Sequence, residues 1–356
     1  LGLVGNPHHS FPSVHIGGTA GKGSTAHIAT AILKESGYKV GLHTSPHLER
    51  INERIQINRK EISDKELIRL VNWIKPYIKR VGQEGKYGSP TYFEVIVALA
   101  FEYFKRKKTD IAIVEVGLGG TLDATNVLEP LVAVITNVHL DHTHILGRTV
   151  QKIAHDKAGI IKEGIDVVTA ATQKSVKDII RKKCNEKHAH LTTIDVSRQY
   201  YLRETAIVGG HQQTNIACTI SAIEALRKHG YKTSESEISK ALNSIQIPAR
   251  FEVINLKANK LKAVLDGAHN PIKTRALVDT LKEEFPNKKI TFIFAVKKTK
   301  DIQGMLKNLL PITKKMYITS FKTKTDLGKD QNEDVRVIAK LINKIKPSTQ
   351  FEIIKN

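Results

Sequence analysis

Residues 13–54, SVHIGGTAGKGSTAHIATAILKESGYKVGLHTSPHLERINER, decide the fold of this chain. The apolar run at 14–16 predicts a short buried strand, and a glycine-rich turn over residues 17–23 follows it. A predicted helix then opens at Ser24 and ends at Gly37. Strand, glycine turn and helix together present backbone N–H groups and a helix N-terminus to a phosphate group. The stretch therefore predicts a phosphate-binding turn in an α/β domain.

The side chains of the turn support the same interpretation. Lys22 would add a point charge for the outer phosphates of a nucleotide, and the hydroxyl of Ser24 or Thr25 would lie near its metal ion. The strict phosphate-loop pattern nevertheless fails, because Ile16 stands where it requires glycine and Gly23 stands where it requires Ser or Thr. The alternative is an ordinary glycine-rich turn between a strand and a helix.

The composition is that of a large globular protein. With 356 residues and 40% apolar content, the chain is long enough for two domains and a sizeable core. It has no run of about 18 apolar residues and no charged-then-apolar start, so we expect neither a membrane span nor a signal peptide. Its two cysteines, Cys184 and Cys218, are too few for a disulfide framework and indicate a reducing compartment, the cytoplasm.

The net charge of +21 allows three interpretations, which are a lysine-rich solvated surface, attraction of acidic small substrates, and nucleic-acid binding. The lysines are spread along the chain, and the densest runs, 105–108, 181–183 and 297–300, are short and contain no aromatic residues. This pattern favours the solvated surface, then acidic small substrates, and we expect no nucleic-acid partner.

A second glycine-rich stretch, DIAIVEVGLGG at residues 110–120, contains a predicted strand that ends in Glu115. Ligands of open α/β sheets bind beyond the carboxyl ends of the strands. A carboxylate in an apolar strand is costly unless it is paired or binds a metal ion. Glu115 is therefore a candidate metal ligand, with a buried ion pair as the alternative.

A further apolar strand is predicted over residues 131–138, and it is followed by His139-Leu140-Asp141-His142-Thr143. Asp141 and His142 at a strand tip resemble a metal-binding pair, although the pair alone is a weak signal.

GTAGKGST, followed by HTSPHLERINERIQIN, closely resembles the folylpolyglutamate synthase / dihydrofolate synthase family, whose members are ATP-dependent ligases related to the Mur ligases. The family usually has Asn where Ala20 stands. The resemblance implies an α/β fold with two domains. Residues 1–246 would form an N-terminal ATP-binding domain with a mostly parallel sheet. Residues 247–356 would form a smaller, Rossmann-like C-terminal domain, and we expect the chain to be shortened at both ends relative to the family.

The resemblance also implies the site residues. GGHQQTN at 209–215, PAR at 248–250 and DGAHNP at 266–271 resemble family motifs that approach ATP. The implied ATP-binding residues are Gly18, Thr19, Gly21, Lys22, Gly23, Ser24, Thr25, His211, Gln212, Asn215, Arg250, Asp266 and His269. The residues implied in catalysis are Lys22, Lys157, Arg250 and His269.

The implied ligands of two Mg²⁺ (magnesium) ions are Ser45, Glu115, His142 and Lys157, and the family's lysine at the last position is commonly carbamylated. On its own, Ser45 would be a plain turn serine. A bare ammonium beside two cations would be repelled, whereas a carbamate could bind them. The sequence itself contains only a lysine at this position.

The implied reaction is ligation of L-glutamate to the carboxylate of a folate or dihydropteroate through an acyl phosphate, by a monomer with small-molecule partners. Three alternatives remain. They are a Mur-type amide ligase acting on a cell-wall precursor, a basic nucleic-acid-linked ATPase, and an inactive remnant. The family is usually longer over 165–201, where we expect strand, helix and polar strand, and the match is poor beyond residue 320, which leaves the glutamate-binding residues open.

Overall fold

The computed structural model describes residues 1–84, 88–195, 205–256, 261–321, 324–325, 328–329 and 332–354. The chain forms two compact units. The first contains residues 1–207 and 212–247, and the second contains residues 208–211 and 248–356. Each unit is described by itself below. The division into two domains at residues 246 and 247 remains a prediction.

The first unit contains an eight-stranded sheet in the order β4-β3-β2-β5-β1-β6-β7-β8. The run from β2 to β8 is parallel, and β3 and β4 are antiparallel additions at one edge. The strands are β1 (Ser13–Gly17), β2 (Val40–His43), β3 (Ile55–Ile57), β4 (Lys60–Glu61), β5 (Ile111–Glu115), β6 (Val132–Ile135), β7 (Asp166–Thr169) and β8 (His190–Thr193).

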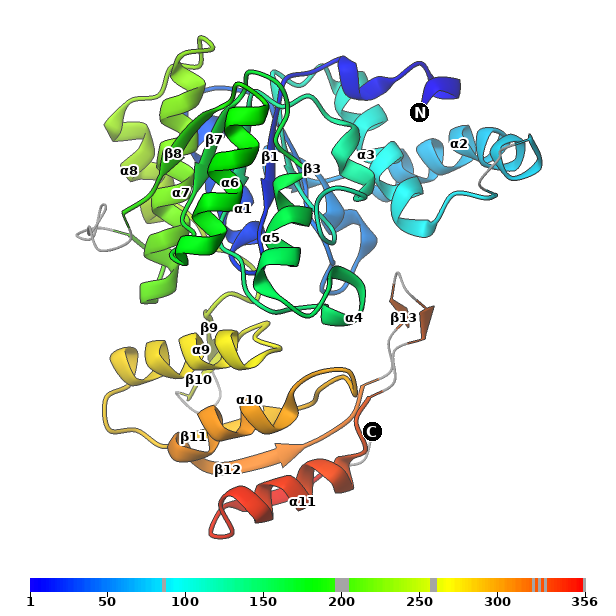
Figure 1. The fold of residues 1–356 in the computed structure, drawn as a ribbon. Helices are drawn as coiled ribbons and strands as arrows, with labels where there is room; N and C mark the ends of the chain where they lie inside the picture. The colour runs from blue at the N-terminus through cyan, green and yellow to red at the C-terminus, as the bar shows by residue number, and fades with distance from the viewer. Residues whose placement is uncertain are drawn as a thin grey trace. The chain divides into compact units, whose positions relative to one another are not determined.

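Helices cover both faces of this sheet, and in Figure 1 α5 and α6 lie in front of the strands. One hydrophobic core joins one sheet face to α1 (Lys22–Glu35), α7 (Gly210–Arg227) and α8 (Glu235–Ser244). Two further cores join the other face to α2 (Asp64–Glu84), α3 (Tyr92–Lys107), α5 (Val150–Ala158) and α6 (Lys174–Glu186). The short elements of this unit are η1 (Gly2–Val4), η2 (Pro7–His9), η3 (Ile51–Arg54), η4 (Ala124–Val127) and α4 (Thr143–Leu146).

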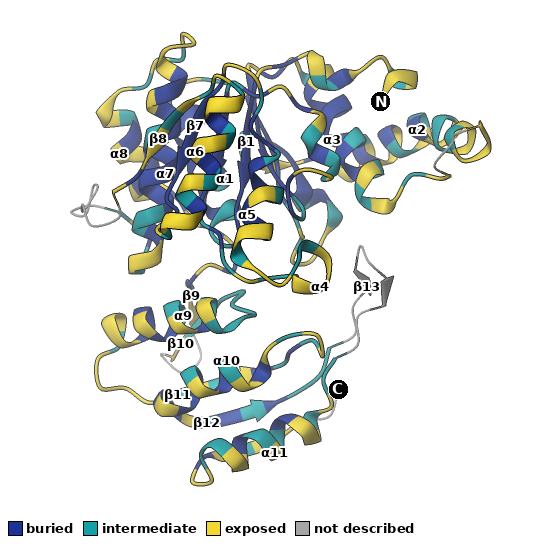
Figure 2. Ribbon diagram, in the orientation of Figure 1, coloured by how far each residue is buried: buried dark blue, intermediate teal, exposed yellow. Residues whose placement is uncertain are grey.

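The sequence explains these elements locally. The parallel strands consist largely of Val, Ile, Leu and Ala because both of their faces are covered by helices, and Figure 2 shows the strands as the buried centre of the unit. Thr91 caps α3 and forms a reciprocal capping box with Glu94. At the start of α2, Ser63 Oγ accepts from Glu66 N and donates to the Glu66 carboxylate.

The second unit has a parallel three-stranded sheet in the order β11-β12-β15 and separate antiparallel pairs, β9–β10 and β13–β14. Its core is formed mainly by α9, α10, α11 and the three-stranded sheet. The elements are β9 (Glu252–Leu256), β10 (Leu261–Leu265), α9 (Pro271–Glu284), β11 (Ile290–Phe294), α10 (Ile302–Leu309), η5 (Leu310–Ile312), β12 (Thr313–Ile318), β13 (Lys324–Thr325), β14 (Gly328–Lys329), α11 (Val335–Ile345) and β15 (Gln350–Ile353).

The predicted α/β fold class is confirmed, and individual elements differ from prediction. The strand predicted over 131–138 ends at Ile135, because the residues after it leave the sheet and bind a neighbouring loop. The polar strand predicted within 165–201 is β8, whereas residues 196–201 lie outside the described residues. The poorly matching loop over 321–334 lies largely outside them as well.

Among the described residues, no helix combines the length and apolar character that crossing a membrane requires.

Candidate nucleotide and metal site

The carboxyl ends of β2, β5, β1 and β6 meet at one edge of the first unit's sheet, because these strands are adjacent and parallel. Four loops begin there. They carry Ser45 after β2, Glu115 at the end of β5, the phosphate loop (residues 17–23) after β1, and His142 after β6. This is the edge at which open α/β sheets bind their ligands.

The phosphate loop is held by the residues that follow β6. Asn137 accepts from Thr19 N with its carbonyl oxygen and from Ala20 N with its side chain, both at 2.9 Å. Ala20 O in turn accepts from Asn137 Nδ2 at 3.0 Å and from Thr136 Oγ1 at 2.6 Å. Position 20 is therefore fixed through its backbone, which explains how alanine can replace the family's usual asparagine there.

Two glycines of this loop have conformations and surroundings that exclude other residues. Gly18 has φ +138°, and an added Cβ would lie 1.9 Å from Thr136 Oγ1. Gly21 has φ +84°, and an added Cβ would lie 2.1 Å from Asn215 Oδ1. The backbone can approach these neighbours closely only because no side chain intervenes.

Helix α1 begins at Lys22, two residues earlier than predicted, so the phosphate loop leads directly into its N-terminus. The first N–H groups of a helix have no partner within the helix and favour anions. Ser24 and Thr25 are buried in the first turn, and Thr25 Oγ1 has no hydrogen-bond partner within the described part of the chain. A buried hydroxyl of this kind is available to a ligand.

Lys22 and Lys157 converge on the same carbonyl group. The Nζ atom of Lys22 donates to Gly18 O at 3.2 Å, and Nζ of Lys157 donates to the same oxygen at 3.0 Å. Burial, and after it the charge of Lys22, lower the pKa of Lys157 from 10.5 to about 7. Asp156, Asp141 and Asp123 act in the opposite direction. Lys157 is therefore an amine that is partly neutral near neutral pH, in a site that already holds one cation.

Glu115 and Ser45 also lie together beside the phosphate loop. The Glu115 carboxylate accepts a hydrogen bond from Ser45 N at 3.1 Å. An added Cβ at Gly23 would lie 3.4 Å from Glu115 Oε2, so this carboxylate contacts the first turn of α1. Ser45 precedes Pro46 in a cis peptide bond. The two predicted metal ligands are thus neighbours, and the Glu115 carboxylate lies beside the N-terminus of α1.

His142 is the N-cap residue of α4 and has φ +47°. Its Nε2 atom lies 3.9 Å from Asp141 Oδ1. Asp141 raises the pKa of Lys157, which places this acidic residue within electrostatic range of the lysine.

The residues present fit Mg²⁺ in their chemistry. Mg²⁺ prefers oxygen ligands and usually needs only one or two carboxylates together with phosphate oxygens and water. Glu115 supplies a carboxylate and Thr25 an unpartnered buried hydroxyl within the described residues. The described residues contain no group of three or more His, Cys, Asp or Glu side chains placed to hold a metal ion.

Two predicted nucleotide contacts lie on α7, and one of them, Asn215, lies against the phosphate loop. Gln212 and Asn215 are both buried, and Asn215 Nδ2 donates to Gln212 Oε1 at 2.7 Å. Asn215 also contacts the phosphate loop at Gly21, as the 2.1 Å approach to an added Cβ shows.

The remaining predicted residues gather within the second unit. Asp266 accepts from Phe251 N at 2.9 Å and from Ala268 N at 2.8 Å, and Arg250 Nη1 donates to Ala249 O at 2.9 Å. Burial lowers the pKa of His211. The charge of Asp266 acts to raise this pKa, and the charge of Arg250 acts to lower it. These three residues are therefore neighbours.

His269 of the same unit is engaged through both ring nitrogens. Its Nδ1 donates to Gly267 O at 2.8 Å, and its Nε2 lies 3.2 Å from the Lys273 ammonium, which can only donate. The imidazole is therefore neutral, with its proton on Nδ1.

Sequence reasoning missed two functional groups of residues. Thr136 and Asn137, which bind the phosphate loop, were assigned to a strand, and their polar character directly after an apolar run was the available signal. Asp123 was given no role from the sequence, whereas the structure shows it bound to backbone and hydroxyl groups of its own loop.

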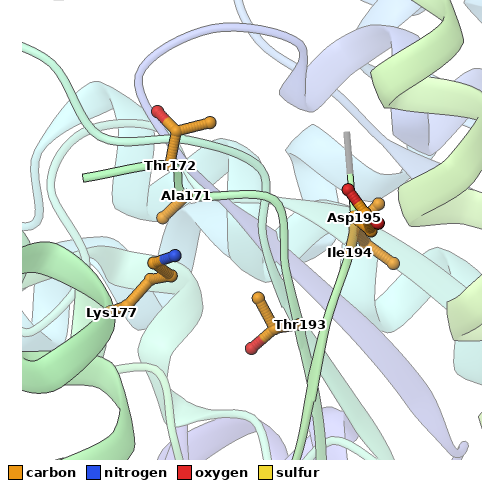
Figure 3. Close-up of a pocket in the computed structure, with 6 residues that line it drawn as sticks. All are labelled: Ala171, Thr172, Lys177, Thr193, Ile194 and Asp195. Carbon is orange, nitrogen blue, oxygen red and sulfur yellow. The ribbon is translucent and has the colours of Figure 1, made fainter. Parts of the chain in front are cut away.

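Two hollows contain none of the predicted site residues. One, of about 310 Å³, lies beyond the carboxyl ends of β7 and β8, and Figure 3 shows Lys177 reaching from α6 toward its other lining residues. The other, of about 440 Å³, is lined by residues between Leu281 and Ile312 of the second unit. In the first hollow Thr172, Thr193 and Asp195 are exposed, so it is a shallow surface feature.

Comparison with known families covers nearly the whole chain. Residues 16–259 match the Mur ligase middle domain, and residues 249–355 match the dihydrofolate synthetase C-terminal domain. Together with the fold and the phosphate loop, these matches define a ligase of the Mur type.

The sequence is similar to the dihydrofolate synthase/folylpolyglutamate synthase of Bacillus subtilis, with 37% identity over 93% of this chain and 81% of the relative. It is 34% identical to the folylpolyglutamate synthase of Lacticaseibacillus casei, over 89% of this chain and 78% of the relative.

Solved structures agree. The folylpolyglutamate synthase of Mycobacterium tuberculosis complexed with ADP has a TM-score of 0.89 and 28% identity, and the match covers 100% of this chain and 83% of that one. An FPGS–AMPPCP–folate complex has a TM-score of 0.83 and 30% identity, with 100% and 90% covered. The chain belongs to the folylpolyglutamate synthase / dihydrofolate synthase family, which confirms the resemblance drawn from GTAGKGST and HTSPHL.

The lowered pKa of Lys157 gives a first prediction. The pKa is about 7 in the folded protein against 10.5 for an unperturbed lysine, so between these values the unfolded chain binds a proton that the folded chain does not. The free energy of unfolding therefore rises with pH across this window. In metal-free buffer without CO₂, we expect the wild type to gain stability relative to Lys157→Met between about pH 7 and pH 9, measured by urea unfolding. A difference that stays constant with pH would contradict this expectation.

Proposed function

We propose that this protein is an ATP-dependent ligase that joins L-glutamate to the carboxylate of a folate or a dihydropteroate. One observation carries the proposal. The carboxyl edge of the sheet brings the phosphate loop, Lys22, Lys157, Glu115 and Ser45 together, in a chain whose relatives are named as folylpolyglutamate and dihydrofolate synthases. The related complex with AMPPCP and folate supports the pairing of an ATP-like nucleotide with a pterin acid.

The reaction divides into two transfers. A carboxylate oxygen of the pterin acid attacks the γ-phosphorus of ATP, the bond to the β–γ bridging oxygen breaks, and ADP leaves. The amine of glutamate then attacks the acyl carbon, and phosphate leaves with the electron pair of the carbon–oxygen bond. In the first transfer, negative charge is distributed over the oxygens of the transferring phosphoryl group. Positioning and electrostatic stabilisation therefore supply most of the catalysis.

The first unit's residues have clear parts in this scheme. The N-terminus of α1 and the phosphate loop bind the phosphates, and the Lys22 ammonium stabilises the charge of the transferring group. Asn137 and Thr136 keep the loop in one conformation, so the N–H groups need no rearrangement during the reaction. Asn215 contacts this loop and donates a hydrogen bond to Gln212, and both residues are proposed on the adenine side of ATP.

The proposed metal site consists of Ser45, Glu115, His142 and Lys157, with Thr25 as a further hydroxyl. When bound, Mg²⁺ neutralises the phosphate charge and orients the transferring group. Arg250, Asp266, His269 and His211 of the second unit stay predicted nucleotide contacts, and Arg250 and His269 stay predicted catalytic residues. A monomeric state without nucleic-acid partners also stays a prediction.

We include carbamylation of Lys157 in the proposal. Only a neutral amine attacks CO₂, and the lowered pKa of Lys157 supplies that form near neutral pH. Nitrogen–carbon bond formation, with loss of one proton, converts a potential cation beside Lys22 into a carboxylate. The charge of the site then changes from one that repels Mg²⁺ to one that attracts it.

The decisive test measures ADP release by the purified chain with Mg²⁺, ATP and L-glutamate, using dihydropteroate, tetrahydrofolate or no acceptor. We expect release that requires one of the pterin acids. Release with dihydropteroate alone identifies a dihydrofolate synthase, with tetrahydrofolate alone a folylpolyglutamate synthase, and with both a bifunctional enzyme. Absence of pterin-dependent release from folded protein would overturn the proposal and favour a Mur-type ligase on another substrate or an inactive remnant.

Lys22→Ala should lower the rate of ADP formation by at least about 100-fold, because the phosphate charge loses its nearest ammonium. Lys34→Ala is the matched control, since Lys34 is exposed in the last turn of the same helix. We expect the control to keep wild-type turnover. Near-normal turnover by Lys22→Ala would show that the phosphate-loop assignment is wrong.

Lys157→Ala should lose ligase activity, and short carboxylic acids should restore part of it by supplying a free carboxylate where the carbamate would lie. Wild-type protein in ¹³C-bicarbonate should give a carbamate NMR signal that the variant lacks. If the variant keeps full activity without added acid, the carbamate is not required.

A further inference from the structure

His15 is a buried polar residue in the middle of β1, the strand that leads into the phosphate loop. Its side chain is fully buried in a strand whose neighbours, Val14 and Ile16, are apolar core residues. A buried polar group is costly unless it makes a hydrogen bond. His15 Nε2 makes one such bond, at 2.7 Å, to Oγ1 of Thr125 in η4, and Thr125 is also fully buried.

The hydrogen bond between Thr125 and Asp123 shows which of His15 and Thr125 is the donor. Thr125 Oγ1 lies 2.5 Å from Asp123 Oδ1, and a carboxylate can only accept, so the threonine hydroxyl donates to Asp123. Its single proton is then used, and the proton between His15 and Thr125 must come from His15. His15 is therefore the neutral tautomer with its proton on Nε2. Its Nδ1 atom has no partner within the described residues.

Asp123 connects this pair to a loop. Its Oδ2 accepts from Leu118 N at 2.8 Å, and its Oδ1 also accepts from Thr125 N at 3.0 Å. One carboxylate thus joins both ends of the glycine loop, which we define as residues 117–125. The loop cannot shift without breaking a bond to Asp123, and Asp123 is held in turn by Thr125 and, through it, by His15.

The opposite side of the glycine loop contacts the end of α5. Thr121 donates to Asp156 O twice, from its N at 3.0 Å and from its Oγ1 at 2.9 Å. An added Cβ at Gly120 would lie 2.6 Å from Asp156 O and 2.9 Å from the Cα atom of Lys157. The position of the loop therefore fixes the position of the Lys157 backbone.

We propose that His15 is a positioning residue which, through Thr125 and Asp123, sets the glycine loop and hence the placement of Lys157 in the active site. The proposal deepens the proposed function and rests on it for the role of Lys157. Under this proposal, two loops at the same edge of the sheet are held by different residues. Residues after β6 hold the phosphate loop, whereas a side chain from β1 holds the loop after β5.

Because the two loops are held by different residues, a change at His15 should affect one loop and not the other. Loss of the His15 N–H should loosen the glycine loop and slow phosphoryl transfer, while nucleotide binding should stay close to wild type because Asn137 and Thr136 still hold the phosphate loop. A merely structural role of a core residue would instead weaken nucleotide binding and turnover together.

Two pairs of variants isolate the hydrogen bonds. His15→Leu removes the donor, whereas His15→Gln keeps an N–H at about the same distance from the backbone. Thr125→Val removes the hydroxyl in an isosteric side chain, whereas Thr125→Ser keeps it. Thr30→Val is the matched control, because Thr30 is equally buried and its hydroxyl donates to Ala26 O of its own helix.

The experiment measures amide hydrogen exchange over residues 116–126, the Kd for ADP, and kcat for ADP release with the active pterin acid. In His15→Leu and Thr125→Val we expect faster exchange of Leu118 and Thr125, a kcat lowered about 10-fold to 100-fold, and a Kd within about 2-fold of wild type. His15→Gln, Thr125→Ser and Thr30→Val should stay near wild type. The double variant His15→Leu/Thr125→Val should lose no more than either single variant.

Unchanged exchange in the glycine loop, multiplicative losses in the double variant, or a parallel fall in ADP affinity would each overturn the proposal. If His15→Leu does not fold, Thr125→Val and Thr125→Ser decide the same question. If the wild type shows no pterin-dependent turnover, the proposed function fails, and the exchange comparison alone then decides whether His15 and Thr125 hold the loop.

Discussion

Two lysine ammonium groups donate to one carbonyl oxygen, that of Gly18, and the chemistry of the site depends on this convergence. Like charges so close together are tolerated only if one group loses its proton or an anion joins them. Lys157 takes the first course in part, because burial, and after it the charge of Lys22, lower its pKa to about 7. The phosphates of a nucleotide would provide the second. The arrangement requires glycine at position 18, since the Thr136 hydroxyl occupies the space where a Cβ would lie.

The loops around these lysines are braced by strands other than the ones they follow. The phosphate loop extends from β1 and is bound by residues after β6, and the glycine loop extends from β5 and is bound through His15 of β1. Neighbouring parallel strands thus cross-link one another's loops at the carboxyl edge. Such bracing limits the reorganisation of the site during reaction, which is the condition for strong electrostatic stabilisation.

The residues alone predicted the parallel α/β sheet and the phosphate loop, and the reasons are local. The grouping of Ser45 with Glu115 came only from the family resemblance. Apolar runs such as Ile111–Glu115 end at glycines or polar residues, and parallel strands place those ends at one edge. The role of Asn137 could not be read in this way, because it depends on which strand lies beside β1. His15 was hidden for the same reason, since a histidine in a strand shows its partner only when η4 is placed. Helix α11 was not predicted, although its buried residues Ile338 and Ile342 are spaced four apart, as on one face of a helix.

The chain passes between the two compact units more than once, because residues 208–211 belong with the second unit while the flanking segments belong with the first. The second unit is therefore not one continuous piece of the sequence. A gene fragment that begins at residue 248 would lack His211 and Val208, and Val208 packs against the core of that unit. Recombination between relatives at a single crossover near residue 248 would therefore combine a short segment from one parent with the body of the second unit from the other. Such a chimera keeps the packing of the second unit only where both parents agree at Val208 and at the core residues that it contacts.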